Sequence, residues 1–260
     1  LALHASIADE ASVDLALKEL AILYSAYSDG LATPLPAPKL QHADLVRWQD
    51  GWMQSAVLDG QIGWWRERLD GAPAALALPF DHIRPPVQTH AGARHVWFIP
   101  HRASETELGS AFAILLHRFS GQSDISIGLE LPQRSLDGAA GLLGPLVNLA
   151  VLRLTVETGM TISEVTRNYE EALADVREHG ATPFDLIVEA MQPERRLNQS
   201  PLFQVLLRPQ PDEMSVPLFN RAKARTLPDD LVRSEYDLTL TLRATGGGIE
   251  ELHHGADSVP

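Results

Sequence analysis

The spacing of apolar side chains predicts several helices along the chain. Between Asp9 and Tyr27, apolar residues recur at intervals of three and four, acidic residues open the segment and Gly30 follows it. The segment from Thr161 to His179 has the same period, and Thr161 with Glu164 forms a capping box. Further helices are expected at His42–Leu69, Ser110–Ser120 and Pro183–Met191.

Alternating or continuous apolar runs between these helices predict strands. The runs are Arg94–Ile99, Ile125–Leu131, Val147–Val156, Leu202–Arg208 and Asp237–Arg243. Proline-bearing stretches at Leu31–Pro38 and Leu78–Pro86 predict connectors rather than regular elements. Strands interleaved with helices indicate an α/β layered fold.

Composition and charge narrow the possible partners and sites. The formal net charge of -13 argues against a nucleic-acid backbone or an anionic membrane as a partner. The absence of cysteine excludes disulfides and thiolate chemistry and fits a cytoplasmic location. There is no apolar run of about 18 residues, so no spanning helix is expected. The start carries no recognisable signal peptide and reads like the middle of a longer polypeptide.

Other candidate chemistry is weak. His253 and His254 are adjacent on an expected strand and therefore point to opposite faces, so no metal site and no cofactor are expected. There is no Gly-x-Ser-x-Gly turn and no phosphate-binding glycine loop. Four tryptophans between Trp48 and Trp65 either contribute to the core or form an interface patch.

Several segments resemble, in order, the condensation domains of nonribosomal peptide synthetases. Gln41–Gln49 is similar to "QYADFAxWQ", Gln61–Pro73 to "QLxYWRxxLxGAP", Leu78–Pro85 to "LPTDRPRP", Leu116–Asp124 to "LLxRYSGQxD", Gly144–Arg153 to "GFFVNTLVLR", His179–Phe184 to "HQDLPFE", and Gln192–Val205 to "QPERxxxxSPLFQV". Tyr236–Leu238 also matches the late "FDL" of these domains.

This resemblance implies a chloramphenicol-acetyltransferase-like fold, in which two lobes form a V around an acyl-transfer channel. Residues 1–30 would be the end of the first lobe, and residues 31–260 would form the second lobe. Most of the first lobe is then missing, and a helix between Pro100 and Ala111 looks shortened. By the same resemblance, Asn148 lies near the channel; alternatively, its amide satisfies buried backbone groups.

The family's "HHxxxDG" motif is altered in this chain. The matching residues run from His4 to Glu10, with His4 and Asp9 retained, Ala5 in place of the catalytic histidine and Glu10 in place of glycine. In the family, the second histidine would orient or deprotonate the acceptor amine that attacks a carrier-bound thioester. A methyl group cannot accept a proton, and losing a positioned base costs about 10²–10⁴-fold in rate.

The other motif residues each have a structural interpretation. In extended backbone His4 would point away from position 5 and could not replace the base; we expect its ring to be satisfied locally. Asp9 either organises the motif or caps the following helix, two compatible roles. Glu10 either stabilises the N-terminus of the helix through its negative charge or contacts a partner.

The altered motif resembles the oxygenase-recruitment (X-type) domains of glycopeptide synthetases, which carry an acidic residue after the aspartate. At the position that matches Ala5, these domains do not usually carry alanine. The resemblance implies a non-condensing platform, with a haem monooxygenase and a neighbouring peptidyl carrier protein domain as partners and no intrinsic activity. One alternative is an active condensation domain that forms peptide bonds between carrier-bound aminoacyl or peptidyl thioesters. Another is a degenerate remnant without partners.

Overall fold

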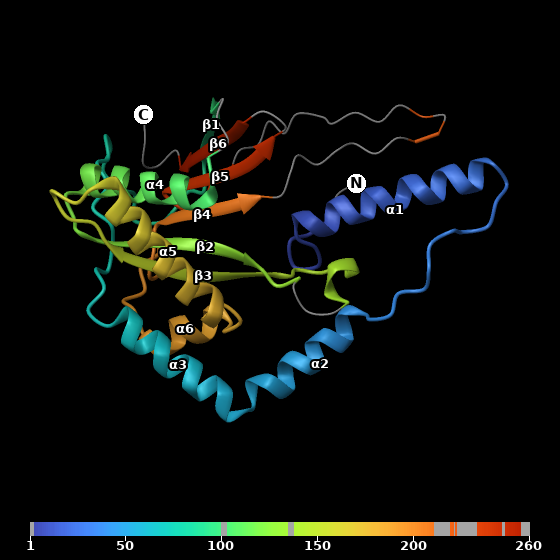
Figure 1. Ribbon diagram of the computed structural model, residues 1–260, viewed down its shortest axis with the longest axis horizontal. Helices are drawn as coiled ribbons and strands as arrows, with labels where there is room; N and C mark the ends of the chain where they lie inside the picture. Colours follow the sequence, from blue (N-terminus) through green and yellow to red (C-terminus); the bar gives the residue numbers. More distant parts are fainter. Residues whose placement is uncertain are drawn as a thin grey trace. The chain divides into compact units, whose positions relative to one another are not determined.

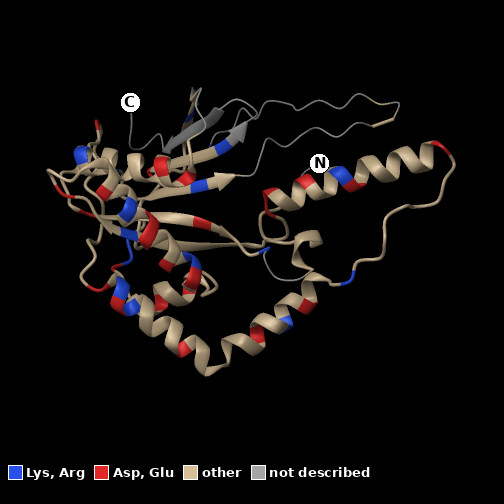
Figure 2. Ribbon diagram, in the orientation of Figure 1, with Lys and Arg blue, Asp and Glu red and all other residues tan. Residues whose placement is uncertain are grey.

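The computed structural model describes residues 3–99, 103–134, 138–210, 219–220, 222, 233–245 and 248–255 (Figure 1). The chain divides into two compact units. The first contains Leu1–Leu58, Pro132–Val147 and Met214–Asp229, and the second contains Asp59–Leu131, Asn148–Glu213 and Asp230–Pro260. The lobe boundary after residue 30 stays a prediction. Acidic residues occur on every α-helix of the described chain, as Figure 2 shows.

The first unit contains two helices and a short turn of helix. They are α1 (Glu10–Ser28), α2 (His42–Met53) and the 3₁₀ turn η1 (Ala139–Gly141). A small buried cluster joins α2 to the segment around η1, and its members are Leu45, Ala139, Leu142 and Leu146. Helix α1 begins where the apolar period and the cap predicted, which confirms that prediction.

The second unit is built on a six-stranded sheet. The strands are β1 (Gly92–Ile99), β2 (Asp124–Pro132), β3 (Val147–Thr155), β4 (Val205–Gln210), β5 (Leu238–Thr245) and β6 (Gly248–Gly255). Their order is β1-β6-β5-β4-β2-β3. Strand β4 runs parallel to both β2 and β5, whereas β6 runs antiparallel to β5 and β1.

Most of the apolar core lies in the second unit, around the central strands. Residues 125–129 of β2 and 205–207 of β4 are buried without alternation, as expected for parallel strands covered on both faces. The helices are α3 (Ala56–Leu69), α4 (Glu105–Ser120), α5 (Ile162–His179) and α6 (Phe184–Met191). Helices α4 and α5 meet where the Tyr169 ring fills the space left by Gly109.

Three sequence-based predictions need correction. The single helix expected from His42 to Leu69 is two helices, α2 and α3. The Ser55 hydroxyl donates to the Trp52 carbonyl oxygen (2.6 Å) and closes a turn between them. Helix α4 begins at Glu105 rather than Ser110, because Ser104 and Glu107 form a capping box. Strand β4 begins at Val205, since Leu202 has a φ of 65° and cannot extend the strand.

Of the other predictions, one is confirmed and one holds only in part. The capping box of Thr161 and Glu164 starts α5 as expected. Of the four tryptophans, Trp65 is fully buried, but Trp48 is 51% exposed, so the core interpretation holds for one end of the cluster and is wrong for the other. None of the helices in the described residues combines the length and apolarity needed to cross a membrane.

Candidate functional site

The altered motif begins as a turn. The Ile7 N–H donates to the His4 carbonyl oxygen (3.0 Å), so the extended backbone expected at positions 4 and 5 is wrong. The exposed His4 ring is satisfied within the turn, because its Nδ1 contacts the Ser6 hydroxyl (2.8 Å) and accepts from the Ser6 N–H (3.2 Å). Ala5 is exposed and presents only a methyl group. Its match to the family's catalytic histidine stays a prediction.

Asp9 joins this turn to α1 and to a distant segment. Its Oδ1 accepts hydrogen bonds from the Ser12 N–H (2.8 Å) and from Arg134 Nη2 (2.6 Å). Its Oδ2 accepts from the Leu146 N–H (3.0 Å). The Asp9 side chain is only 8% exposed. Both interpretations of Asp9, helix cap and organiser of the motif, are therefore present in the geometry.

The ionisation of Asp9 follows from these contacts. Burial by itself would raise the pKa of the carboxyl, but the hydrogen bonds from Ser12 and Arg134 outweigh it and lower the pKa below its ordinary value. The group is therefore ionised at neutral pH. Its role is to hold backbone and side-chain donors in place, since an anion with this pKa is a poor general base at neutral pH.

Ser12 and Arg134 complete the same cluster. The buried Ser12 hydroxyl contacts Asp9 Oδ1 (2.7 Å) and the Gly144 carbonyl oxygen (2.9 Å), and it accepts from Arg134 Nη2 (2.8 Å). Arg134 also donates from Nη1 to the Leu142 carbonyl oxygen (2.7 Å). No local pattern pointed to Arg134, because its partner Asp9 lies 125 positions away.

Gly144, in the segment that Asp9 and Ser12 hold, has little space around it. A Cβ at this position would lie 2.7 Å from Nδ1 of His42. That nitrogen is buried and has no hydrogen-bond partner in the described structure. The glycine therefore lets α2 approach the segment that follows η1. Glu10 lies exposed in the first turn of α1, where a carboxylate favours the helix N-terminus.

Asn148, the candidate channel residue, lies on β3 and bonds to the connection between α5 and α6. Its Nδ2 donates to the carbonyl oxygens of Gly180 (2.9 Å) and Thr182 (2.6 Å), and its Oδ1 accepts from the Phe184 N–H (3.2 Å). This geometry fits the alternative in which the amide satisfies backbone groups. A role for Asn148 in a channel stays a prediction.

No candidate metal centre accompanies these residues. The described part of the chain contains no group of three or more His, Cys, Asp or Glu side chains placed to hold an ion. His253 and His254 lie on β6. The carboxylate of Asp9, the guanidinium of Arg134 and the hydroxyl of Ser12 hold backbone groups in place. The Ala5 side chain supplies no proton acceptor.

Comparison with known proteins links the chain to condensation domains. The family described as "Condensation domain" matches residues 1–251. The chain is 31% identical to malpinin synthetase of Mortierella alpina, covering 95% of this chain and 3% of that protein. It is also 31% identical to phosphinothricin tripeptide synthetase PhsC of Streptomyces viridochromogenes, covering 93% of this chain and 24% of that one.

Solved structures agree on the fold. The X-domain from teicoplanin biosynthesis matches 98% of this chain with a TM-score of 0.87 and 27% identity. The complex of the X-domain and OxyB from teicoplanin biosynthesis matches with a TM-score of 0.85 and 27% identity. The chain spans 63% and 61% of the lengths of these two chains. The predicted chloramphenicol-acetyltransferase-like fold, with roughly one lobe present, is confirmed.

Proposed function

We propose a function from one premise: the chain belongs to the condensation-domain family of nonribosomal peptide synthetases. Within such a synthetase it acts as a non-condensing platform that recruits haem monooxygenases to the carrier-bound peptide. Its partners are then an oxygenase of the same pathway and the neighbouring peptidyl carrier domain. The domain itself contributes binding surface rather than chemistry.

The observation that carries this proposal is the contrast within the motif. Asp9, Ser12 and Arg134 are joined to one another by hydrogen bonds. Ala5, which the resemblance matches to the family's base, is exposed and carries only a methyl group. A retained scaffold with no proton acceptor fits a domain whose fold still serves a purpose, since loss of a positioned base costs about 10²–10⁴-fold in rate.

The likeness to the teicoplanin X-domain supports the choice of partner. That domain forms a complex with OxyB, and this chain matches the complex over 98% of its length. A specific interface of ordinary size buries roughly 800 Å² on each partner. Both units of the chain present exposed apolar residues that are available to such an interface, including Tyr27 at 62% and Phe119 at 60%.

An active condensation domain is the second candidate. The curated relatives at 31% identity are peptide synthetases, and peptide-bond formation between carrier-bound thioesters is the expected reaction of the family. For this function another proton acceptor must take the place of the missing histidine, or substrate positioning must suffice. Positioning by itself can supply a large share of a rate enhancement.

The test uses the full-length synthetase and the monooxygenases of its pathway. We expect gel filtration and calorimetry to give a complex with a micromolar dissociation constant. We also expect a condensation assay to give no peptide bond between the carrier domains that flank this domain. The Ala5→His variant restores the base, and Ala5→Gln is its matched control of similar size. Both variants should bind the oxygenase as the unaltered protein does, because the change lies at the motif.

The two candidate functions give different results. Peptide-bond formation by the unaltered protein supports the condensation function and rejects the platform. Absence of binding to every oxygenase of the pathway also rejects the platform. If Ala5→His forms peptide bonds and Ala5→Gln does not, the missing base is the reason that the unaltered domain does not condense.

A further inference from the structure

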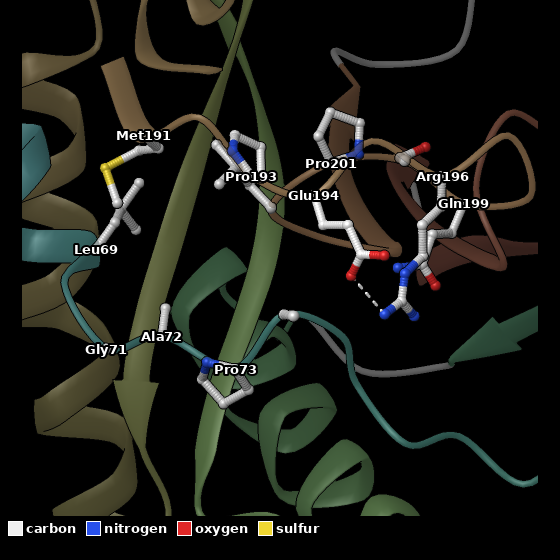
Figure 3. A pocket seen from close by; sticks show the side chains of 13 residues that line it. Leu69, Gly71, Ala72, Pro73, Met191, Pro193, Glu194, Arg196, Gln199 and Pro201 are labelled. Carbon is white, nitrogen blue, oxygen red and sulfur yellow. Dashed lines mark hydrogen bonds and ion pairs between the residues drawn. The ribbon is translucent and has the colours of Figure 1, made fainter. Parts of the chain in front are cut away.

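A cavity of about 200 Å³ lies within the second unit, between the segment that follows α3 and the loop that joins α6 to β4 (Figure 3). Its wall is mainly apolar. Rings of Pro73, Pro193 and Pro201 line it, and the side chains of Leu69 and Met191 lie together at one end. The volume is below the roughly 300–1,000 Å³ of sites that hold drug-sized ligands, so the cavity suits one apolar side chain.

Opposite charges lie at the other end of the cavity. Arg196 Nη2 donates to Glu194 Oε2 at 2.7 Å, and the two side chains are 46% and 69% exposed (Figure 3). Their hydrogen bond and mutual attraction lower the pKa of Glu194 and raise the pKa of Arg196, so both groups are charged at neutral pH. Exposed pairs of this kind contribute little to stability, so either group can turn to a ligand at small cost.

The loop that carries these charges has strained ends. Gln192 has a φ of 47° and Leu202 a φ of 65°, and neither is a glycine. Side chains rarely adopt this left-handed region, and such strain persists only where surrounding contacts impose it. The left-handed Gln192 is the C-cap of α6, whereas Leu202 lines the cavity. The strain at Leu202 therefore favours a binding role for the cavity that the loop encloses.

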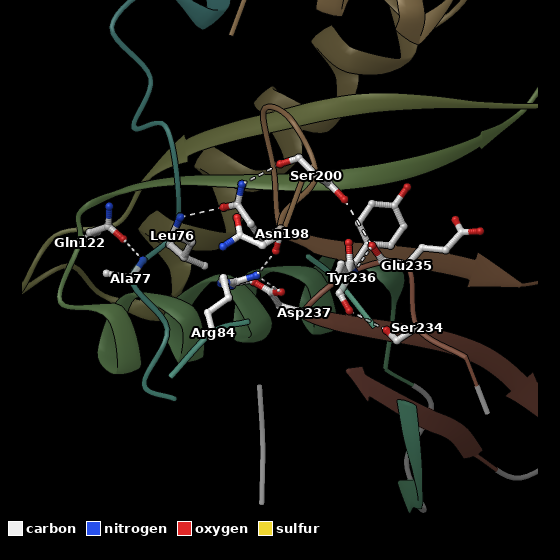
Figure 4. Close-up of polar contacts among 12 residues, drawn as sticks. Leu76, Ala77, Arg84, Gln122, Asn198, Ser200, Ser234, Glu235, Tyr236 and Asp237 are labelled. Carbon is white, nitrogen blue, oxygen red and sulfur yellow. Dashed lines mark hydrogen bonds and ion pairs between the residues drawn. The ribbon is translucent and has the colours of Figure 1, made fainter. Parts of the chain in front are cut away.

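Contacts on the far side of the loop hold it in place (Figure 4). Arg84 Nη1 donates to the Asn198 carbonyl oxygen (2.8 Å), and Gln204 Nε2 donates to the Ser200 carbonyl oxygen (3.1 Å). Arg84 is itself held by the largely buried carboxylate of Asp237. The cavity wall is therefore formed before any ligand arrives, which reduces the entropic cost of binding.

We propose that this cavity binds a free apolar α-amino acid of about the size of leucine. The apolar side chain enters between the proline rings, the α-carboxylate pairs with Arg196, and the α-ammonium pairs with Glu194. A free amino acid is the ligand that offers all three features on neighbouring atoms. A residue within a peptide lacks both charges. This site is separate from the motif and does not depend on the proposed recruitment of an oxygenase.

The test is a titration of the 260-residue chain with L-leucine. Binding is detected through the NMR resonances of ¹³C-labelled methionine methyl groups. Met191 lines the cavity, and the variant Met191→Leu assigns its resonance. We expect a saturable shift at Met191 with a millimolar dissociation constant, the range in which so small a contact area places a ligand. Met53 and Met160 lie elsewhere and should not shift.

Ligand analogues and matched variants test the charges. N-acetyl-leucine lacks the ammonium and leucinamide lacks the carboxylate, so each should bind roughly tenfold more weakly than leucine. Arg196→Gln and Glu194→Gln should each weaken leucine binding by about the same factor. Arg195→Gln, at the exposed neighbouring position, should leave it unchanged. Unshifted Met53 and Met160 resonances show that each variant is folded.

Several results would overturn the proposal. One is the absence of a saturable shift at Met191. A second is equal binding by the Arg196→Gln and Arg195→Gln variants. A third is equal affinity for leucine and both analogues, which would mean that the cavity recognises only an apolar group. Tighter binding of a leucine-containing peptide with blocked ends would make the cavity a peptide-docking site instead.

Discussion

Ser12 and Gly144 stand 132 positions apart in the chain and are joined by two hydrogen-bond contacts. The Ser12 hydroxyl contacts the Gly144 carbonyl oxygen at 2.9 Å, and the Gly144 N–H donates to the same hydroxyl at 2.9 Å. Asp9 and Arg134 add charged partners to the same Ser12 hydroxyl. The motif is therefore anchored by long-range polar contacts, and their energies are open to measurement.

The first prediction concerns the Asp9–Arg134 ion pair. Asp9→Ala leaves the guanidinium of Arg134, which is 14% exposed, without its carboxylate. Breaking a buried pair in this way should lower the free energy of unfolding by about 3 kcal/mol. Urea unfolding measures the loss. Lys18→Ala is the control, because the pair of Lys18 with Asp14 is exposed and should contribute less than about 1 kcal/mol. Equal losses would contradict the buried contact.

The second prediction is a pH dependence with a defined sign. The pKa of Asp9 is lower in the folded state than its ordinary value of 3.8. The contribution of this carboxylate is therefore fully present above about pH 4 and is lost as the pH falls through the folded pKa. The urea midpoint of the unaltered chain should fall more steeply below about pH 4 than that of Asp9→Ala. If the urea midpoints of the two proteins fell in parallel with pH, Asp9 would not be the source of the pH dependence.

The third prediction compares two glycines in the interiors of helices. A Cβ at Gly109 in α4 would lie 2.1 Å from Cζ of Tyr169, whereas one at Gly63 in α3 would meet no atom within 4 Å. We expect Gly109→Ala to lower the free energy of unfolding by about 1–3 kcal/mol through overpacking. Gly63→Ala should raise it by about 0.5–1 kcal/mol, the gain in helix propensity. Thermal unfolding of both variants checks the difference, and a shared sign would contradict the packing of α4 against α5.

The fourth prediction concerns Arg84 and the loop between α6 and β4. Arg84→Ala leaves the 7%-exposed carboxylate of Asp237 without this partner and removes the donor to the Asn198 carbonyl oxygen. The free energy of unfolding should fall by about 3 kcal/mol, and limited proteolysis should cut the loop faster. Arg47→Ala is the control, since Arg47 is 78% exposed. Unchanged proteolysis would mean that other contacts hold the loop.

Much of the local structure was predictable from the sequence. Helices α1 and α5 begin at their predicted caps, because Asp9 and Thr161 accept hydrogen bonds from residues only three positions ahead. The central strands were predictable from continuous apolar runs. The break between α2 and α3 was not, since apolar residues continue through it and the turn at Ser55 carries no glycine or proline.

The candidate site divides in the same way. The sequence by itself predicted which residues match the motif and determined that Ala5 offers no proton acceptor. Only the tertiary structure decided that Asp9 pairs with Arg134, that the Asn148 amide serves the backbone between α5 and α6, and that prolines from distant segments enclose a cavity. The physical reason is the distance along the chain over which each interaction acts. Caps and apolar periods act over a few residues, whereas these contacts depend on how distant segments pack, which no local pattern records.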